Sequence, residues 1–455
     1  MPPSASVSPL ARLALAAVLA FGLAGCDTLS SLNPFNPKQT PLPGTRVDVF
    51  TSDDALASAS QTRSSATISA AQSNAEWPNA GGPANNNPGN VAFSGSGGRA
   101  WSSTVMGGSV GTNWLAGGSI ADRVSARPVI GGGQVFVYQP NGSVSALSLS
   151  GGGRSWQVSL KPEGEKSVAL GGGVAYDQGK VFVATGYGAL TALDASSGKT
   201  LWTKDLTTPA RGAPTVSGGK VFVVSDQNVV FAVNEADGTE AWSYRGIPES
   251  GGLLAAANPA VSGNNLVVPY SSGEVMGFDI AKGEPLWSDA VTQATRTMAL
   301  SSLSDVAASP VIADGMVYAS GVSGRTIAVD LKSGERKWDQ NVGSAHTPVV
   351  SGNALFLVDL DDRAAALDRL TGKPLWSTQL PVVSTKSKRS HWAGPVLAGG
   401  QLWFVSSVGE MVTVDPQSGQ VATPRKIGDP AFMSPVVASG TMVVVSGIGT
   451  LSGYR

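Results

Sequence analysis

Apolar residues recur along the chain as short alternating runs separated by glycine-rich turns. In the clearest copy, residues 213–242, Pro214 leads a short apolar run, a Gly-Gly pair follows, and residues 221–224 are all apolar. A second run alternates over residues 229–233, and an Asp-Gly pair and Trp242 close the copy. Alternation with a period of two predicts strands, and the glycine pairs predict tight turns between them. Each copy is therefore expected to form four antiparallel strands, named A to D in chain order.

Eight such copies follow one another from about residue 127 to the C-terminus. Their first strands begin near Pro128, Gly172, Pro214, Pro259, Pro310, Pro348, Pro395 and Pro435. The intervals of about 38 to 51 residues match the length of a four-stranded propeller blade. The predicted fold class is therefore all-β, an eight-bladed β-propeller with four-stranded antiparallel blades.

The turn between strands C and D has the sharpest signature. It begins with aspartate and has glycine four residues later, as in residues 194–199, 330–335, 368–373 and 415–420. Glycine supplies the positive φ of a tight hairpin, and the repetition of the aspartates indicates turn chemistry. A tryptophan follows the turn position at residues 156, 202, 242, 287, 338 and 376. We expect these rings to pack between neighbouring blades rather than to bind a ligand.

The last copies are incomplete. Copy seven has Val421 where the tryptophan is expected, and copy eight stops at Arg455 after three strands. Residues 99–103, which include Trp101, lie before the first copy and belong to no unit of their own. They are expected to supply strand D of the eighth blade and to close the ring, which removes exposed sheet edges.

The N-terminal sequence predicts an export signal. Arg12 precedes an apolar run over residues 13–23 that is too short to span a bilayer but suits a secretory signal. The run ends at Leu-Ala-Gly-Cys26, which resembles the bacterial lipoprotein signal, and Cys26 is the single cysteine of the chain. An exported chain with one cysteine cannot form an internal disulfide, so lipidation of Cys26 is predicted, with ordinary cleavage nearby and a free thiol as the alternative.

These features divide the chain into three parts. Residues 1–25 are expected to be the signal peptide, residues 26–75 a flexible tether rich in Ser, Ala, Pro, Asn and Thr, and residues 76–455 the propeller. The expected location is the periplasmic face of the outer membrane, held by the lipid anchor. Asp27 resembles the enteric signal for retention at the inner membrane, so that membrane is the alternative.

Composition narrows the function. Of the 455 residues 57 are glycine, which fits many turns between strands. Thirty-one basic residues balance 32 acidic ones, and no long basic stripe is present to neutralise a phosphate backbone. Nucleic acid is therefore not an expected partner.

The repeat resembles that of pyrroloquinoline-quinone-type propellers. The lipoprotein signal, the short tether, the Glu-Trp-Pro-Asn-Ala-Gly-Gly stretch at residues 76–82 and the eight blades are together similar to the BamB family of the outer-membrane β-barrel assembly machinery. The resemblance implies a non-catalytic scaffold that binds the POTRA domains of the central barrel subunit and aids insertion of outer-membrane proteins. Contact with unfolded outer-membrane proteins through strand edges is a further implied role.

Two short motifs contain the residues that the resemblance implies for docking. Arg211 and Gly212 stand before the third strand-A proline, and a Leu-Ser-Asp-Val stretch at residues 303–306 stands before the fifth. Family members often have leucine and a second aspartate where this chain has Ala210 and Ala307. The expected partner-binding residues are Thr208, Ala210, Arg211, Ser304 and Asp305.

Strand order places these residues. D-to-A connections emerge on the same face of a blade as B-to-C turns, so Arg211 and Asp305 are expected as exposed side chains on one rim. Lys199 and Glu335, in C-to-D turns, are expected on the opposite rim.

The alternative function is a periplasmic quinone-dependent dehydrogenase. That class needs a bound metal and an acid or base at the cofactor, and many members use an adjacent cysteine pair that this chain lacks. We therefore expect no catalytic residues, no metal and no cofactor.

Two remaining polar features have structural explanations. His346 and His391 are expected to be structural residues, since no ligand cluster accompanies them. Lys386, Lys388 and Arg389 are expected to form a solvated loop, with contact to anionic lipid or peptidoglycan as the weaker alternative.

Overall fold

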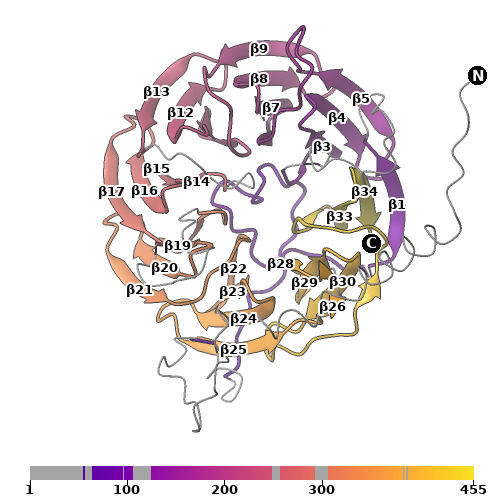
Figure 1. The fold of residues 1–455 in the computed structure, drawn as a ribbon, viewed down its shortest axis with the longest axis vertical. Coiled ribbons are helices and arrows are strands. Elements are labelled where there is room, and N and C mark those ends of the chain that lie inside the picture. The colour runs from indigo at the N-terminus through magenta and orange to yellow at the C-terminus, as the bar shows by residue number, and fades with distance from the viewer. Residues whose placement is uncertain are drawn as a thin grey trace, which may run out of the picture. The chain divides into compact units, whose positions relative to one another are not determined.

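The computed structural model describes residues 55–56, 64–95, 97–105, 124, 126–247, 257–292, 306–382, 384–385 and 388–455. All of them belong to one compact unit, residues 53–455. Cys26, Ser304 and Asp305 lie outside the described residues. The described strands form eight four-stranded antiparallel blades in a ring, so the predicted fold class is confirmed (Figure 1).

The blades follow one another in chain order. Blade 1 contains β2 (Val129–Gly131), β3 (Gln134–Tyr138), β4 (Ser143–Ser148) and β5 (Arg154–Ser159), and blade 2 contains β6 (Gly172–Asp177), β7 (Lys180–Thr185), β8 (Ala189–Asp194) and β9 (Thr200–Asp205). Blade 3 contains β10 (Thr215–Ser217), β11 (Lys220–Val224), β12 (Val229–Asn234) and β13 (Glu240–Arg245), and blade 4 contains β14 (Ala260–Ser262), β15 (Asn265–Pro269), β16 (Glu274–Asp279) and β17 (Pro285–Ala290). Blade 5 contains β18 (Val311–Ala313), β19 (Met316–Ser320), β20 (Thr326–Asp330) and β21 (Arg336–Gln340), and blade 6 contains β22 (Val349–Ser351), β23 (Ala354–Val358), β24 (Arg363–Asp368) and β25 (Pro374–Gln379). Blade 7 contains β28 (Trp392–Ala398), β29 (Gln401–Ser406), β30 (Glu410–Val414) and β31 (Arg425–Lys426), and blade 8 contains β32 (Val436–Ala438), β33 (Thr441–Ser446), β34 (Thr450–Tyr454) and β1 (Arg99–Thr104). A small hairpin, β26 (Ser384–Thr385) with β27 (Lys388–Arg389), lies between blades 6 and 7.

Burial follows position within the blade. Strands B and C, such as β11 and β12, are buried on both faces because each blade is covered by its two neighbours. The outermost strands D, such as β13, alternate between exposed and half-buried residues. This gradient explains the continuous apolar runs of strands B and C and the polar residues of strand D.

The tryptophans join one blade to the next, as predicted. Each indole N–H donates to a backbone carbonyl in the C-to-D turn of the following blade, at 2.8–3.1 Å. The seven pairs are Trp101 with Leu149, Trp156 with Ala195, Trp202 with Glu235, Trp242 with Ile280, Trp287 with Leu331, Trp338 with Arg369 and Trp376 with Pro416.

Backbone conformation and packing both require glycine in the C-to-D turn. Gly198 has a φ of 73°, and a Cβ at this residue would overlap the ring of Trp156 in the preceding blade. The turn aspartate is satisfied locally, since Asp194 Oδ1 accepts hydrogen bonds from the backbone N–H groups of Ser196 and Ser197 at 3.1 and 2.9 Å. The expectation that the repeated aspartates serve the turns is therefore confirmed.

The ring closes between the two ends of the propeller sequence. β1 pairs antiparallel with β34, with Ser102 opposite Ser452, so the predicted closing strand is confirmed. The junction of blades 7 and 8 differs from the other seven, because strands C and D of blade 8, β34 and β1, are far apart in the sequence and no C-to-D turn joins them. Arg425 occupies this junction, with its guanidinium 5.4 Å from the ring centroid of Trp403 and 5.8 Å from that of Tyr454, and it donates to Gly97 O at 2.6 Å.

The inner edge of the ring is covered by residues 74–91, here called the inner segment, which crosses the middle of the propeller (Figure 1). It makes a hydrogen bond with one residue of strand A in every blade. In blade order the pairs are Trp77 O with Ile130 N, Pro78 O with Tyr176 N, Asn79 Oδ1 with Val216 N, Ala84 O with Val261 N, Asn85 O with Ile312 N, Asn87 Oδ1 with Val350 N, Val91 N with Leu397 O, and Asn74 Nδ2 with Val437 O, at 2.6–3.1 Å. The eight inner strand edges are thereby paired within the chain.

The propeller also begins earlier than expected. The tether was predicted to extend to residue 75, but residues 64–75 already hydrogen-bond to blades 6 to 8. Ser64 N–H donates to Leu375 O at 2.8 Å, Thr67 N–H to Asn353 Oδ1 at 2.7 Å, and Ser439 N–H to Asn74 O at 2.8 Å. The polar residues of this stretch, which suggested a tether, form hydrogen bonds on the rim that contains the A-to-B and C-to-D turns.

Candidate functional site: one rim and the central cavity

The D-to-A connections and the B-to-C turns lie on one rim, here called the D–A rim. Pro209 and Arg211, from the connection between blades 2 and 3, line a hollow of about 370 Å³ together with Gly186, Asp226 and Ser271 from B-to-C turns. The predicted placement of Arg211 on this rim is therefore confirmed. Its expected companions Ser304 and Asp305 lie outside the described residues, so their proximity to Arg211 stays a prediction.

The expected exposure of Arg211 is wrong. The residue is only 7% exposed and Ala210 only 1%, while Thr208 is half-buried. The cause is extra pairing, because Ala210 N–H donates to Thr185 O of blade 2 at 3.1 Å and Arg211 N–H to Val224 O of blade 3 at 2.9 Å. These bonds draw the connection between two blades, so Arg211 supports the rim from beneath.

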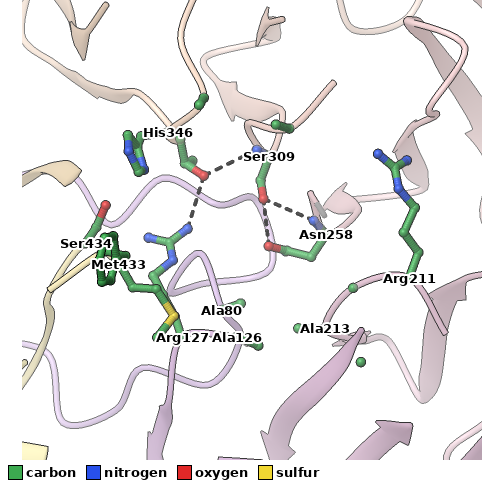
Figure 2. A pocket seen from close by; sticks show the side chains of 16 residues that line it. Ala80, Ala126, Arg127, Arg211, Ala213, Asn258, Ser309, His346, Met433 and Ser434 are labelled. Atoms are coloured by element: carbon green, nitrogen blue, oxygen red, sulfur yellow. Dashed lines mark hydrogen bonds between the residues drawn. The ribbon is translucent and has the colours of Figure 1, made fainter. Parts of the chain in front are cut away.

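The central cavity opens beside this rim and has a volume of about 260 Å³. Its described lining comes from the connections that lead into strands A and from the inner segment: Ala80, Ala126, Arg127, Gly172, Arg211, Gly212, Ala213, Asn258, Ala307, Ser309, Ala345, His346, Thr347, Phe432, Met433 and Ser434 (Figure 2). None of these residues is acidic.

A polar network crosses the cavity wall. Arg127 Nη2 donates to Thr347 Oγ1 at 3.1 Å, and Ser309 N–H donates to the same oxygen at 3.3 Å (Figure 2). Ser309 Oγ in turn donates to Asn258 Oδ1 at 2.8 Å. Burial lowers the pKa of Arg127 to about 10, and burial together with the positive charge of Arg127 lowers the pKa of His346 to about 4. The imidazole is therefore neutral at neutral pH.

Comparison with known proteins identifies the family. A family profile described as outer membrane protein assembly factor BamB matches residues 140–378 and 360–455, which together make up more than half of the chain. The chain belongs to the BamB family. It is 30% identical over 335 residues to outer membrane protein assembly factor BamB of Salmonella typhimurium, covering 71% of this chain and 83% of that one. It is 28% identical over 334 residues to the Yersinia pestis protein of the same name, covering 72% and 84%.

Solved structures agree on the fold. BamB from Moraxella catarrhalis superposes with a TM-score of 0.63 at 22% identity, covering 74% of this chain and 97% of that one. A europium-containing methanol dehydrogenase superposes with a TM-score of 0.64 at 16% identity, covering 83% and 90%. The propeller is thus shared by the BamB family and by dehydrogenases, and the fold does not separate the two functions.

A hard cation beside a quinone takes oxygen ligands, mainly carboxylates. Within the described part of the chain, no group of three or more His, Cys, Asp or Glu side chains could hold a metal ion. The described lining of the central cavity offers guanidinium, amide and hydroxyl groups instead, which do not fit a hard cation.

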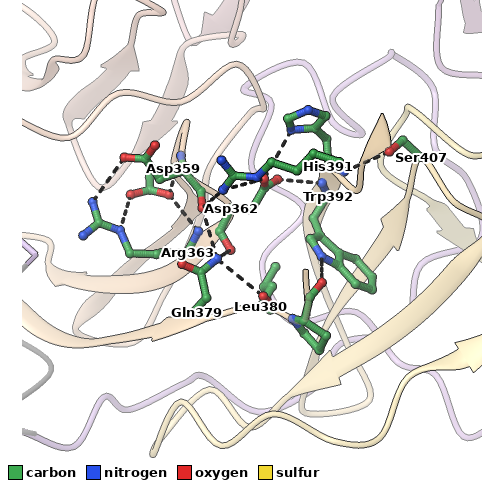
Figure 3. Close-up of polar contacts among 11 residues, drawn as sticks. Asp359, Asp362, Arg363, Gln379, Leu380, His391, Trp392 and Ser407 are labelled. Atoms are coloured by element: carbon green, nitrogen blue, oxygen red, sulfur yellow. Dashed lines mark hydrogen bonds and ion pairs between the residues drawn. The ribbon is translucent and has the colours of Figure 1, made fainter. Parts of the chain in front are cut away.

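Between blades 6 and 7, this BamB-family chain has a second polar cluster on the D–A rim. Asp362 Oδ1 accepts the Trp392 N–H at 2.9 Å, while its Oδ2 lies 3.2 Å from His391 Nδ1 and 3.7 Å from Arg389 (Figure 3). Asp359 pairs with Arg363 at 2.7 Å. These contacts position the start of β28, which is the structural role predicted for His391. Lys386 lies outside the described residues.

The D–A rim also carries most of the exposed large apolar side chains of the described chain. Five lie in its connections and turns: Ile247, Leu360, Val382, Phe432 and Ile448. The other three are Leu201 and Leu286 on strands D and Leu370 in a C-to-D turn. Sequence reasoning missed these residues because single apolar positions in connections have no periodicity. No helix among the described residues is long and apolar enough to cross a membrane.

Proposed function

We propose that the protein is a non-catalytic, lipid-anchored scaffold of the β-barrel assembly machinery that binds the POTRA domains of the barrel subunit through its D–A rim. Membership of the BamB family supports the assembly role. The observation that carries the docking surface is the concentration of exposed apolar side chains on this rim. Exposed apolar side chains that gather on one face mark interaction sites, and loops on a rigid scaffold concentrate recognition residues.

The proposed surface centres on the B-to-C turn of blade 3. Asp226 N–H donates to Pro209 O at 2.9 Å, and Asn228 Nδ2 donates to Ile247 O at 2.7 Å, so this turn holds both the Arg211 connection and Ile247. Arg211 then orders the surface from below, and Ile247, which is 54% exposed, makes the apolar contact. Ser304 and Asp305 are proposed to join this surface from the connection before blade 5.

Anchorage and substrate contact complete the proposal. Cys26 carries the lipid, with the outer membrane as the proposed location and the inner membrane as the alternative raised by Asp27. Since the inner edges of the blades are paired by the inner segment, the outer edges of strands D are the proposed sites for pairing with unfolded outer-membrane proteins.

The test is a matched pair of charge insertions. Ile247→Glu should weaken pull-down of the POTRA-containing subunit by about tenfold, because a carboxylate would be desolvated in the apolar contact. Leu370→Glu, on the opposite rim and 66% exposed, should leave pull-down unchanged. Both variants should melt within about 2 °C of wild type, since exposed substitutions shift stability by less than about 0.5 kcal/mol. Equal pull-down by Ile247→Glu and wild type would refute docking at this surface, and quinone released on denaturation would favour the dehydrogenase.

A further inference from the structure

Arg127 brings a positive charge to the central cavity. Two arginines and a histidine line it, and none of its described lining residues is acidic. Arg127 donates to the Thr347 hydroxyl, and no carboxylate among the described residues lies within 4 Å of its guanidinium. Neutral His346 contributes no compensating charge.

Four other partly buried arginines pair with a carboxylate, whereas Arg425 meets a backbone carbonyl and two aromatic rings. Arg325 pairs with Asp339, Arg336 with Asp289, Arg363 with Asp359 and Arg369 with Asp314. Desolvating a guanidinium without an anion costs several kcal/mol, so chains normally supply a carboxylate. Arg127 donates to a neutral hydroxyl instead, and it lies where connections from most of the blades converge on a cavity.

The neighbouring donors favour a planar anion. Thr347 Oγ1 accepts hydrogen bonds from both Arg127 and Ser309 N–H, and within the described residues no acceptor receives its own proton. A guanidinium and an adjacent hydroxyl match the two oxygens of a carboxylate. The rest of the lining, with Ala80, Ala126, Phe432 and Met433, offers apolar surface for a short hydrocarbon portion.

We propose that the central cavity binds a carboxylate group, held by the Arg127 guanidinium and the Thr347 hydroxyl, on a ligand with a short apolar body. A free short-chain acid and an acidic side chain of a peptide both have this chemistry, and about 260 Å³ accommodates either. The proposal is independent of docking at Ile247, because Ile247 does not line the cavity.

Calorimetry with the purified full-length protein tests the proposal. The first arm uses succinate against its neutral diamide, and the second uses an N-acetylated, C-amidated hexapeptide with one central Glu against its Gln counterpart. Succinate or the Glu peptide should bind, and neither neutral counterpart should. Arg127→Gln should weaken that binding at least tenfold, while Arg154→Gln, at an exposed arginine on β5, should not change it.

The two arms of the experiment distinguish a free acid from a polypeptide as the source of the carboxylate. Binding of succinate indicates a free acid, and binding of the Glu peptide alone indicates a polypeptide. Thr347→Val, which removes the hydroxyl and keeps the charge, must also weaken binding, and it serves if Arg127→Gln does not fold. Failure of both acids to bind wild type, or equal binding by wild type and the Thr347→Val variant, would overturn the proposal.

Discussion

Two different kinds of side chain pack the junctions between neighbouring blades. At seven junctions an indole packs on a turn glycine and donates to that turn. At the junction of blades 7 and 8 the assignment of Val421 to the tryptophan position is wrong, because Val421 pairs with Val414 as Thr200 pairs with Leu193. Thr423 lies at that position, four residues after Gly419, and Arg425 fills the space from β31. A long cation suits this junction because it can reach the carbonyl of Gly97 and also stack on two aromatic rings.

We expect Arg425→Ala to lower the free energy of unfolding by about 2–3 kcal/mol, from one charged hydrogen bond and two cation–π contacts. Chemical denaturation measures this loss. The control is Arg154→Ala on β5, where the side chain contacts only Gln157 in the described structure, and it should cost under about 0.5 kcal/mol. Equal effects of the two variants would show that Arg425 does not hold the junction.

His346 makes stability depend on pH. Its folded pKa is about 4, below its ordinary value of 6.5, so the unfolded chain binds the proton more readily. The stabilising contribution is complete above pH 6.5 and is lost as the pH falls toward 4. Because the ring borders an open cavity, we expect about 1–2 kcal/mol between pH 8 and pH 5. Denaturation at both pH values should show a smaller difference for His346→Gln than for wild type, and an identical difference would contradict the assignment.

At the scale of elements, two N-terminal pieces complete a structure that the repeats alone leave unfinished. β1 supplies the eighth outer strand, and the inner segment pairs one residue of every strand A. Both work because sheet edges present unpaired N–H and C=O groups that another strand or segment can satisfy. The chain thereby covers the innermost edges of all eight blades and joins the first blade to the last.

Deletion of residues 99–103 should expose the outer edge of β34 and remove the Trp101 contact with blade 1. We expect a lower melting temperature, less cooperative unfolding and aggregation through the open edge. Thermal melting with light scattering measures all three. An unchanged melting temperature of the deletion variant would show that β1 does not stabilise the ring.

The proposed scaffold works at a membrane, so the location of the whole molecule is a test of the proposed anchor. If Cys26 carries acyl chains, Cys26→Ser should release the protein into the periplasm, because the buried CH₂ groups that anchor it are lost. Cell fractionation measures the distribution after partner proteins are stripped with high salt. A Cys26→Ser variant that stays in the membrane pellet would refute the anchor.

Local pattern was enough to predict the propeller. The period-two runs, the Asp-to-Gly turns and the recurring tryptophans predicted the blade count, the strand order and the closing role of Trp101. These features are visible because each blade is a local unit whose strands are adjacent in the chain and whose turns demand particular residues. The repeat also shows where a unit is incomplete, and so the need for an N-terminal strand could be predicted.

Tertiary structure decided whatever joins distant parts of the chain. The inner segment satisfies strands as far away as Val437, and polar composition alone suggested a tether for residues 64–75. Arg211 became buried through backbone pairing with two blades, and Arg127 meets Thr347 across 220 positions of sequence. Such contacts have no periodicity of their own, because they depend on the ring bringing connections from separate blades to one axis.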